Sequence, residues 1–156
     1  MDRFNKIIKS DKYKEILERV SIAEQDRIYC LHNFEHSCDV ARIMYITALE
    51  KNIPIPKEII YTTAFLHDIG RIEQYKNSTP HEVASVEMSK EFLAEFDKAE
   101  QEMILRAISE HRSQGVRSAL GELLSYADTK SRMCLNCKAI TTCKWKAYQM
   151  NMEVLV

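Results

Sequence analysis

Apolar residues recur along this chain at intervals of three and four, which is the spacing of one face of an α-helix. The pattern predicts helices over residues 11–26, 33–51, 56–70, 79–96, 97–111, 118–133 and 138–150. The chain contains only three Gly and three Pro, fewer than an extended β-architecture usually needs for its turns. We therefore expect an all-α fold, a bundle of about six to seven helices.

Helix boundaries in this pattern carry recognisable capping residues. Asp97 with Glu100 three positions later can form a capping box at the start of a helix. Thr79 with Glu82 has the same spacing and predicts a second capped helix start. Gly70, after the third predicted helix, is typical of a helix C-terminus.

The composition indicates an ordinary globular protein. At 156 residues the chain suits one domain, with a core over about 30–133 and a cysteine-containing tail over 134–156. Lys plus Arg (22) nearly balances Asp plus Glu (23), so charge gives no support for broad nucleic-acid or membrane binding. The start of the chain lacks a signal-like apolar run, and no stretch approaches the roughly 20 apolar residues of a membrane span. We expect a cytoplasmic protein, and a homo-oligomer is compatible with the sequence.

Four of the five histidines and one aspartate occupy informative helical positions. The residues that continue or close an apolar helix face are His36, His67, His81, His111 and Asp128, with Asp68 beside His67. A carboxylate or imidazole that faces a core must be paired or coordinated, because burying it without a partner costs several kcal/mol. Groups from several helices can satisfy one another by converging on a cation. Mixed nitrogen and oxygen donors favour one or two divalent transition metal ions such as Fe, Mn, Zn, Co or Ni.

Each of these residues also has a simpler interpretation. A single buried histidine is usually hydrogen-bonded within a core, and a lone motif match carries a high false-positive risk. Asp128 by itself could pair with Lys130 or Arg132. The joint pattern nevertheless favours a metal site, since unrelated core histidines would not all need to mark helix faces in this way.

At these residues the sequence resembles the HD-domain superfamily of metal-dependent phosphohydrolases. That family has a His, a later His-Asp doublet and a distant Asp on separate helices. Here the pattern reads as His36, then His67-Asp68 within the string Leu-His-Asp-Ile-Gly, then Asp128. The resemblance covers residues 33–128 and implies an all-helical fold with a metal centre.

A finer resemblance concerns the number of metals. Some branches of the superfamily use two further histidines between the doublet and the last Asp, and His81 and His111 look like those two. The arrangement is similar to bacterial HD hydrolases of diadenosine tetraphosphate and to cyclic-dinucleotide phosphodiesterases, although the extended motifs of the latter are missing. The resemblance implies a second ion on His81 and His111, with Asp68 bridging the two metals.

Three further residues are candidates for the substrate. Arg71 follows Ile-Gly where these branches commonly have Lys, and the resemblance implies a catalytic phosphate contact beside Asp68; a surface arginine is the alternative. Arg112 is a weaker candidate for the same role. His32 lies four residues before His36 and either lines the pocket or caps its own loop.

The end of the chain holds an unexplained cysteine cluster. Cys134 and Cys137 form a Cys-x2-Cys pair and Cys143 follows six residues later, which is three of the four ligands of a structural metal. The fourth ligand could be Cys30, Cys38 or a water. Buried thiols or a reversible disulfide are the alternatives.

The sequence as a whole predicts a metal-dependent phosphohydrolase. The expected partner is a small phosphorylated molecule, on resemblance a nucleotide, attacked by a metal-bound hydroxide. Two alternatives remain open at this point. One is a regulatory domain that binds a nucleotide or metal without turnover, and the other is a di-iron oxygenase of the HD type.

Overall fold

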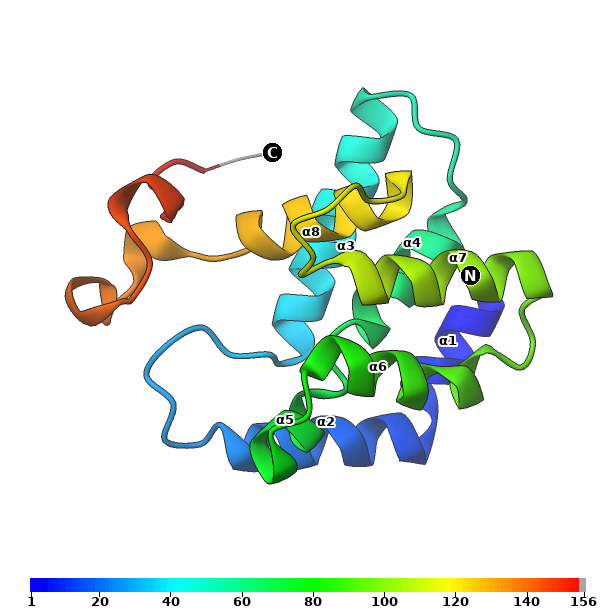
Figure 1. Cartoon of the computed structure of the whole chain (residues 1–156), viewed down its shortest axis with the longest axis horizontal. Helices are drawn as coiled ribbons and strands as arrows, with labels where there is room; N and C mark the ends of the chain where they lie inside the picture. Colours follow the sequence, from blue (N-terminus) through cyan, green and yellow to red (C-terminus); the bar gives the residue numbers. More distant parts are fainter. Residues whose placement is uncertain (155–156) are drawn as a thin grey trace.

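The computed structural model describes residues 1–154, which contain α-helices and short 3-10 helices and no β-strand (Figure 1). The α-helices are α1 (Asp2–Lys9), α2 (Asp11–Ala23), α3 (Phe34–Glu50), α4 (Lys57–Leu66), α5 (Arg71–Asn77), α6 (His81–Ser89), α7 (Lys98–Glu110) and α8 (Ala119–Lys130). The 3-10 helices are η1 (Lys90–Leu93), η2 (Cys134–Asn136), η3 (Ile140–Thr142) and η4 (Ala147–Gln149). The expected all-α class is confirmed.

The long amphipathic helices follow the sequence pattern closely. Helix α3 begins after Asn33, whose side chain accepts a hydrogen bond of 3.0 Å from the amide of His36. Helix α7 begins with the expected capping box, in which the side chains of Asp97 and Glu100 each bond the other's amide. Both helices therefore start where a side chain satisfies free N–H groups.

The helix predicted over residues 56–70 ends earlier than expected. Helix α4 stops at Leu66, the next four residues form a turn, and α5 begins at Arg71, where no separate helix was expected. Gly70 has φ −75°, so it is not a left-handed cap. Its role is close approach: an added Cβ would lie 2.4 Å from both the carbonyl oxygen of His81 and the amide of Ser85.

Other boundaries also differ from the expectation. The helix predicted over 79–96 is α6 followed by η1, and its N-cap is Pro80, which makes no side-chain capping bond. Thr79 instead donates its hydroxyl to the side chain of Asn77 at 2.6 Å. The helix predicted over 138–150 is absent, and η3 and η4 take its place. The short helix α1 was not expected.

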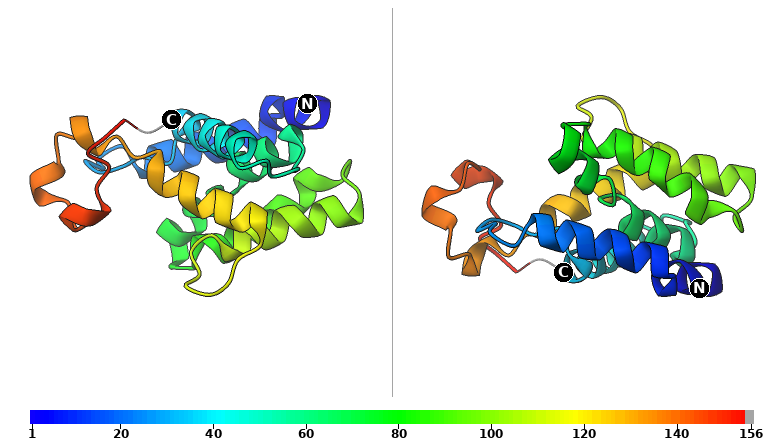
Figure 2. Two further views of the ribbon diagram at one scale, coloured as in Figure 1. Left: turned by 90° about the horizontal axis from the view of Figure 1, so that it is seen from above. Right: turned by 90° about the horizontal axis from the view of Figure 1, so that it is seen from below.

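Helix α4 packs against α1, α3, α7 and α8, and α3 also packs against α8, while α7 also packs against α6 and α8 (Figures 1 and 2). The largest fully buried apolar side chains come from α2, α3, α4, η1, α7 and α8 and the turn after α4.

Among residues 1–154, no helix is long and apolar enough to cross a membrane.

The segment after α8 extends away from the helical body and lies beside the loop over residues 24–33 (Figures 1 and 2). The hydroxyl of Tyr29 in that loop donates to the carbonyl of Thr142 at 3.1 Å. The two segments therefore meet next to the N-terminus of α3.

Candidate metal centre

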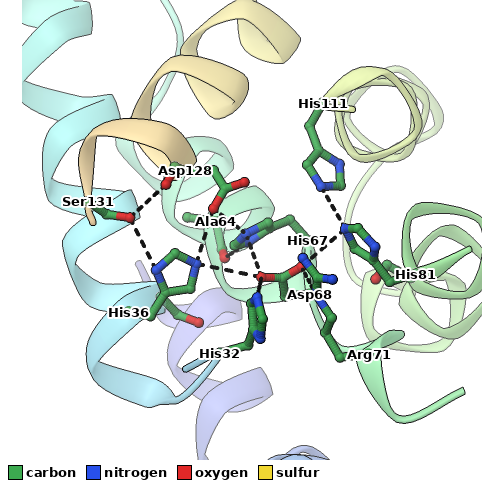
Figure 3. A network of polar contacts seen from close by, with 12 residues as sticks. His32, His36, Ala64, His67, Asp68, Arg71, His81, His111, Asp128 and Ser131 are labelled. Carbon is green, nitrogen blue, oxygen red and sulfur yellow. Dashed lines mark hydrogen bonds and ion pairs between the residues drawn. The ribbon is translucent and has the colours of Figure 1, made fainter. Parts of the chain in front are cut away.

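Six side chains from five parts of the fold converge at one place between α3, α4, α6, α7 and α8 (Figure 3). They are His36 in the first turn of α3, His67 and Asp68 in the turn after α4, His81 at the start of α6, His111 at the end of α7 and Asp128 in the last turn of α8. All six are buried. These are the six residues that the sequence predicted as ligands.

The six residues form two groups whose potential ligand atoms lie within 4.8 Å of one another. The first group is His36, His67, Asp68 and Asp128, and the second is Asp68, His81 and His111. Asp68 belongs to both. Its Oδ2 lies 3.5 Å from Nε2 of His36 and 3.1 Å from Nε2 of His67, whereas its Oδ1 lies 3.4 Å from Nε2 of His81. One carboxylate therefore presents one oxygen to each group.

Backbone carbonyls fix the orientation of two imidazoles. Nδ1–H of His67 donates to the carbonyl of Ala64, and Nδ1–H of His111 donates to that of Ile108, both at 2.6 Å. Each bond directs Nε2 into the cluster. Such outer hydrogen bonds are typical of histidines that bind metal.

His36 is oriented by a relay through Ser131. The hydroxyl of Ser131 donates to the carbonyl of Asp128 at 2.9 Å, so it accepts from Nδ1–H of His36 at 3.2 Å (Figure 3). The hydroxyl thus connects a side chain of α3 to the end of α8, and Nε2 of His36 faces the two carboxylates.

Four buried atoms in the cluster have no hydrogen-bond partner: Nε2 of His36, Nε2 of His67, Oδ2 of Asp68 and Nδ1 of His81. Leaving such atoms unpaired costs about 1–3 kcal/mol each. The first three belong to the first group, and a divalent ion among them would satisfy them together. The donor set of imidazole nitrogens and carboxylate oxygens fits a transition metal.

The carboxylates are held in their charged form. Burial alone would raise the pKa of Asp68, but the charges of His67 and Arg71 outweigh burial and hold the pKa well below its ordinary value. Burial likewise opposes a lowered pKa at Asp128, where hydrogen bonding to His36 and the charge of Arg132 prevail. Both groups are therefore anionic at neutral pH.

The second group contains two neutral histidines. Burial lowers the pKa of His81 to about 3 and that of His111 to about 4. Their Nε2 atoms lie 3.2 Å apart, and the carboxylate of Glu82 lies 3.3 Å from Nδ1 of His81. Glu82 is thus positioned to orient His81, although it does not close the capping box that its spacing suggested.

A cavity of about 700 Å³ opens beside this cluster, between the loop over residues 24–33 and the segment after α8. Its lining includes His32, His36, Arg71, Arg112 and Arg132. Four arginines and one lysine line the cavity against two carboxylates, so it favours an anionic ligand; the five are Arg27, Arg71, Arg112, Arg132 and Lys144.

The predicted arginines lie at the edge of the cluster. Arg71 is largely buried and donates from Nε to Oδ1 of Asp68 at 3.0 Å, so it is not a free surface residue. Arg112 is half-exposed, with one guanidinium nitrogen 3.8 Å from Oδ2 of Asp128.

Comparison with known proteins agrees with this geometry. The sequence model of the HD domain matches residues 33–141, more than two thirds of the chain. The chain belongs to the HD domain family. An uncharacterized protein of Clostridium beijerinckii is 43% identical over 99% of both chains. The crystal structure of a predicted HD superfamily hydrolase from an uncultured Thermotogales bacterium has a similar fold, with a TM-score of 0.63, 22% identity, and coverage of 89% of this chain and 81% of that one.

His32 lies at the side of the HD centre and lines the cavity, as one of its two sequence interpretations had it. Its Nε2 is 4.0 Å from Oδ2 of Asp68. Its ring Nδ1 lies 2.5 Å from the carboxylate of Glu24, which also accepts from the amide of His32 at 2.8 Å. The hydroxyl of Tyr75 donates to the same carboxylate.

Two functional neighbours were missed in the sequence. Glu24 is buried against His32, and Arg132 is buried against Asp128. Arg132 donates one hydrogen bond to the carboxylate of Asp128 and another, of 3.1 Å, to its backbone carbonyl. The sequence offered Arg132 as a partner of Asp128 only in place of a metal site, whereas in the structure Arg132 pairs with Asp128 beside the other candidate ligands. Arg132 follows Asp128 by four residues but lies after the end of α8, so helical spacing did not assign it to the site.

The cysteines do not form a third ligand group of this kind among residues 1–154. All five are free thiols. Cys134, Cys137 and Cys143 line the cavity together with Cys30, and Cys38 is packed against the core instead.

Proposed function

We propose that this chain is a metal-dependent phosphohydrolase that acts on a nucleotide or a related small phosphoester or phosphoanhydride. The observation that carries the proposal is the carboxylate of Asp68, which offers one oxygen to each of two buried groups of potential ligands. Membership of the HD domain family supports it. So does the description of the Thermotogales protein of similar fold as an HD superfamily hydrolase.

In this proposal the two groups hold two divalent ions. His36, His67, Asp68 and Asp128 hold one, and His81 and His111 hold the other with Asp68 between them. When bound, such a pair supplies a hydroxide nucleophile at neutral pH and neutralises charge on the phosphoryl group. The protein keeps Asp68 ionised and fixes each imidazole through its outer nitrogen.

The arginines at the mouth of the centre are suited to the phosphate of the substrate. Arg71 stays beside Asp68, and Arg112 is exposed enough to reach a ligand in the cavity. A guanidinium can bind two phosphate oxygens at once and stabilise the charge that develops on them. The cavity volume lies within the usual range of small-molecule sites, about 300–1,000 Å³.

A nucleotide suits the remainder of the cavity. Its lining includes the aromatic rings of Tyr29 and Trp145, against which a base could stack. The resemblance to HD hydrolases of diadenosine tetraphosphate makes dinucleoside polyphosphates the first compounds to test, followed by nucleoside mono-, di- and triphosphates.

His32 is arranged to handle a proton next to the reacting phosphate. Glu24 accepts from its Nδ1–H and from its amide, so the ring is held with Nε2 toward Asp68. A buried, oriented imidazole within reach of the reacting atoms is the usual form of a general acid or base. We assign His32 that role rather than a role as a ligand.

The test is a hydrolysis assay on the metal-loaded full chain with these nucleotides, in which chromatography separates the nucleotide products, because cleavage of a dinucleoside polyphosphate gives two nucleotides and no free phosphate. We expect hydrolysis that needs added Mn²⁺, Fe²⁺, Co²⁺, Ni²⁺ or Zn²⁺ and that falls by at least about a hundredfold in Asp68→Asn, which removes the shared charge. Lys98→Ala, on the exposed surface of α7, is the matched control and should keep full activity.

Two results would contradict the proposal. Tight nucleotide binding without hydrolysis of any nucleotide would favour the regulatory domain. Oxygen consumption by an iron-loaded chain, with no hydrolysis of any nucleotide, would favour the oxygenase.

A further inference from the structure

Four of the five cysteines face one cavity although they come from two distant parts of the sequence. Cys30 belongs to the loop before α3, and the other three lie in the segment after α8 at positions 134, 137 and 143. The remaining cysteine, Cys38, lies on α3 and contacts the core. We propose that the four cavity cysteines bind one structural Zn²⁺ ion, separate from the histidine-aspartate centre.

The local backbone suits this role. The amide of Cys137 donates to the carbonyl of Cys134 at 3.1 Å, which closes a tight turn across the Cys-x2-Cys pair. The amide of Cys143 donates to the carbonyl of Ile140 at 3.3 Å and closes a second turn. Pairs of thiols on short turns are typical of structural zinc sites.

A hydrogen bond already joins the two segments that carry the cysteines. Tyr29 precedes Cys30 and donates to the carbonyl of Thr142, which precedes Cys143. The fourth ligand therefore comes from the loop that touches the cysteine segment. This observation selects Cys30 over Cys38 and over water as the missing ligand.

The segment after α8 lacks a core of its own. Between residues 134 and 154 only Cys134, Ala139 and Asn151 are buried, and the secondary structure consists of 3-10 helices. Tyr148 is 80% exposed. Segments that cannot bury enough apolar surface are commonly held by a structural metal, because the free energy of metal binding then serves as folding free energy.

The charge around the thiols supports four thiolates. Binding of Zn²⁺ requires four deprotonated cysteines, whose protons pass to solvent, and leaves a net charge of −2 on the site. Arg27, Arg132 and Lys144 line the same cavity and can offset that charge. No three of the four sulfur atoms lie within 4.8 Å of one another in the structure, so binding of the ion would have to draw the turns inward.

Such a site would hold one wall of the cavity next to the HD centre. Cys30 is two residues from His32, and Cys134 is two residues from Arg132. The zinc would therefore fix the backbone on both sides of the cavity mouth. This inference does not depend on hydrolysis, since thiolate binding can be measured directly.

Cobalt substitution in the full-length wild-type chain is the direct test. Co²⁺ bound by several thiolates gives intense sulfur-to-cobalt charge-transfer absorption in the near ultraviolet, which Co²⁺ bound by histidine and aspartate lacks. We expect this band in the wild type at one equivalent of thiolate-bound Co²⁺, and its loss when Zn²⁺ is added. Its absence in a folded, reduced and Co²⁺-saturated protein would overturn the proposal.

Variants then identify the ligands. Cys30→Ser and Cys137→Ser, one from each segment, should each weaken the band and lower the zinc content by one equivalent, while Cys38→Ser should leave both unchanged. An unchanged band in Cys30→Ser would overturn the assignment of the fourth ligand. A purified protein with the visible absorption and sulfide content of an iron–sulfur cluster would overturn zinc as the ion.

Discussion

At the residue scale, the chemistry of the site depends on the neighbouring groups that fix the orientation of each candidate ligand. Asp68 is held by Arg71 on one oxygen and faces His36 and His67 with the other. The two oxygens therefore differ in surroundings, which lets one side chain serve two groups. A carboxylate with free rotation would not divide its oxygens in this way.

His32 gives a prediction at the same scale. His32→Ala should lower kcat by about 10²–10⁴-fold, the usual contribution of a general acid or base, without removing metal. Glu24→Gln keeps an acceptor for Nδ1–H but loses the charge, so its loss of kcat should be smaller. Steady-state kinetics with metal analysis of both variants checks this.

The metal content of His32→Ala separates proton transfer from metal binding. If His32→Ala loses a metal ion in proportion to activity, His32 is a ligand and its assignment as the proton-transfer group is wrong.

The six clustered residues could be predicted from the sequence because His36, His81, His111 and Asp128 continue apolar helix faces and His67-Asp68 is the doublet that the resemblance singled out. A polar residue within an apolar helical pattern will be buried, so the sequence alone shows that it needs a hydrogen-bond partner or an ion. Glu24 and Arg132 gave no comparable signal. Glu24 is the C-cap of α2, and it contacts His32 only because the loop over residues 24–33 turns back. Arg132 lies beyond the last turn of α8.

At the scale of elements, the turn after α4 sets the spacing between the two ligand groups. Gly70 lets the backbone of α6 pass against the turn that carries Asp68, and its amide donates to the hydroxyl of Ser85 at 2.9 Å. His81 is the first residue of α6, so this contact fixes its distance from Asp68.

Gly70→Ala should therefore push α6 away. The new Cβ would meet backbone atoms of His81 and Ser85, which cannot move as a side chain can. We expect a loss of stability of about 1–3 kcal/mol and weakened binding of the second metal. Denaturant unfolding and metal titration measure the two effects.

Gly115→Ala is the matched control, because no atom lies within 4 Å of its added Cβ. It should leave stability and metal content unchanged. Equal behaviour of the two alanine variants would show that the close approach at Gly70 has no role.

Elements with a long apolar face or a side-chain cap were predictable, as α3 and α7 are. Short elements that depend on tertiary contacts were not. Helix α1 has eight residues and lies against α2 and α4, and α5 has no buried residue and packs on α2 and α6. Isolated helices of that length are marginal, so the local sequence gives little signal.

At the scale of the whole molecule, one ion-pair network ties the N-terminal helix to the bundle. The guanidinium of Arg3 in α1 contacts Glu58 in α4 and Glu100 in α7. Burial would raise the pKa of Glu58, but hydrogen bonds from the N-terminal amine and Arg3 lower it from its ordinary 4.5 to about 2. Glu58 is therefore more acidic in the folded than in the unfolded chain.

The sign of the effect follows from linkage. Because the folded pKa is lower, the stabilisation by Glu58 is complete above about pH 4.5 and is lost as the pH falls through about 2. Glu58→Gln should lower the free energy of unfolding at pH 7 by about 1.5–3 kcal/mol, and the difference from wild type should shrink between pH 4.5 and 2. Urea unfolding across this range measures it.

Glu95→Gln is the control for that experiment. Glu95 pairs with Lys6 on the surface, where both side chains are more than half exposed, so its change should stay below about 1 kcal/mol at all pH values. A Glu58→Gln deficit that does not vary with pH would contradict the role of its charge.

The central claim is that Asp68 joins two metal sites, and elemental analysis of fully loaded protein tests it most directly. His81→Ala and His111→Ala should each bind one metal fewer than wild type and keep the ion of the first group, because His36, His67, Asp68 and Asp128 remain. Counting the difference between variant and wild type makes the result independent of any thiolate-bound ion. An unchanged metal content in both variants would contradict the account and leave a centre with one metal.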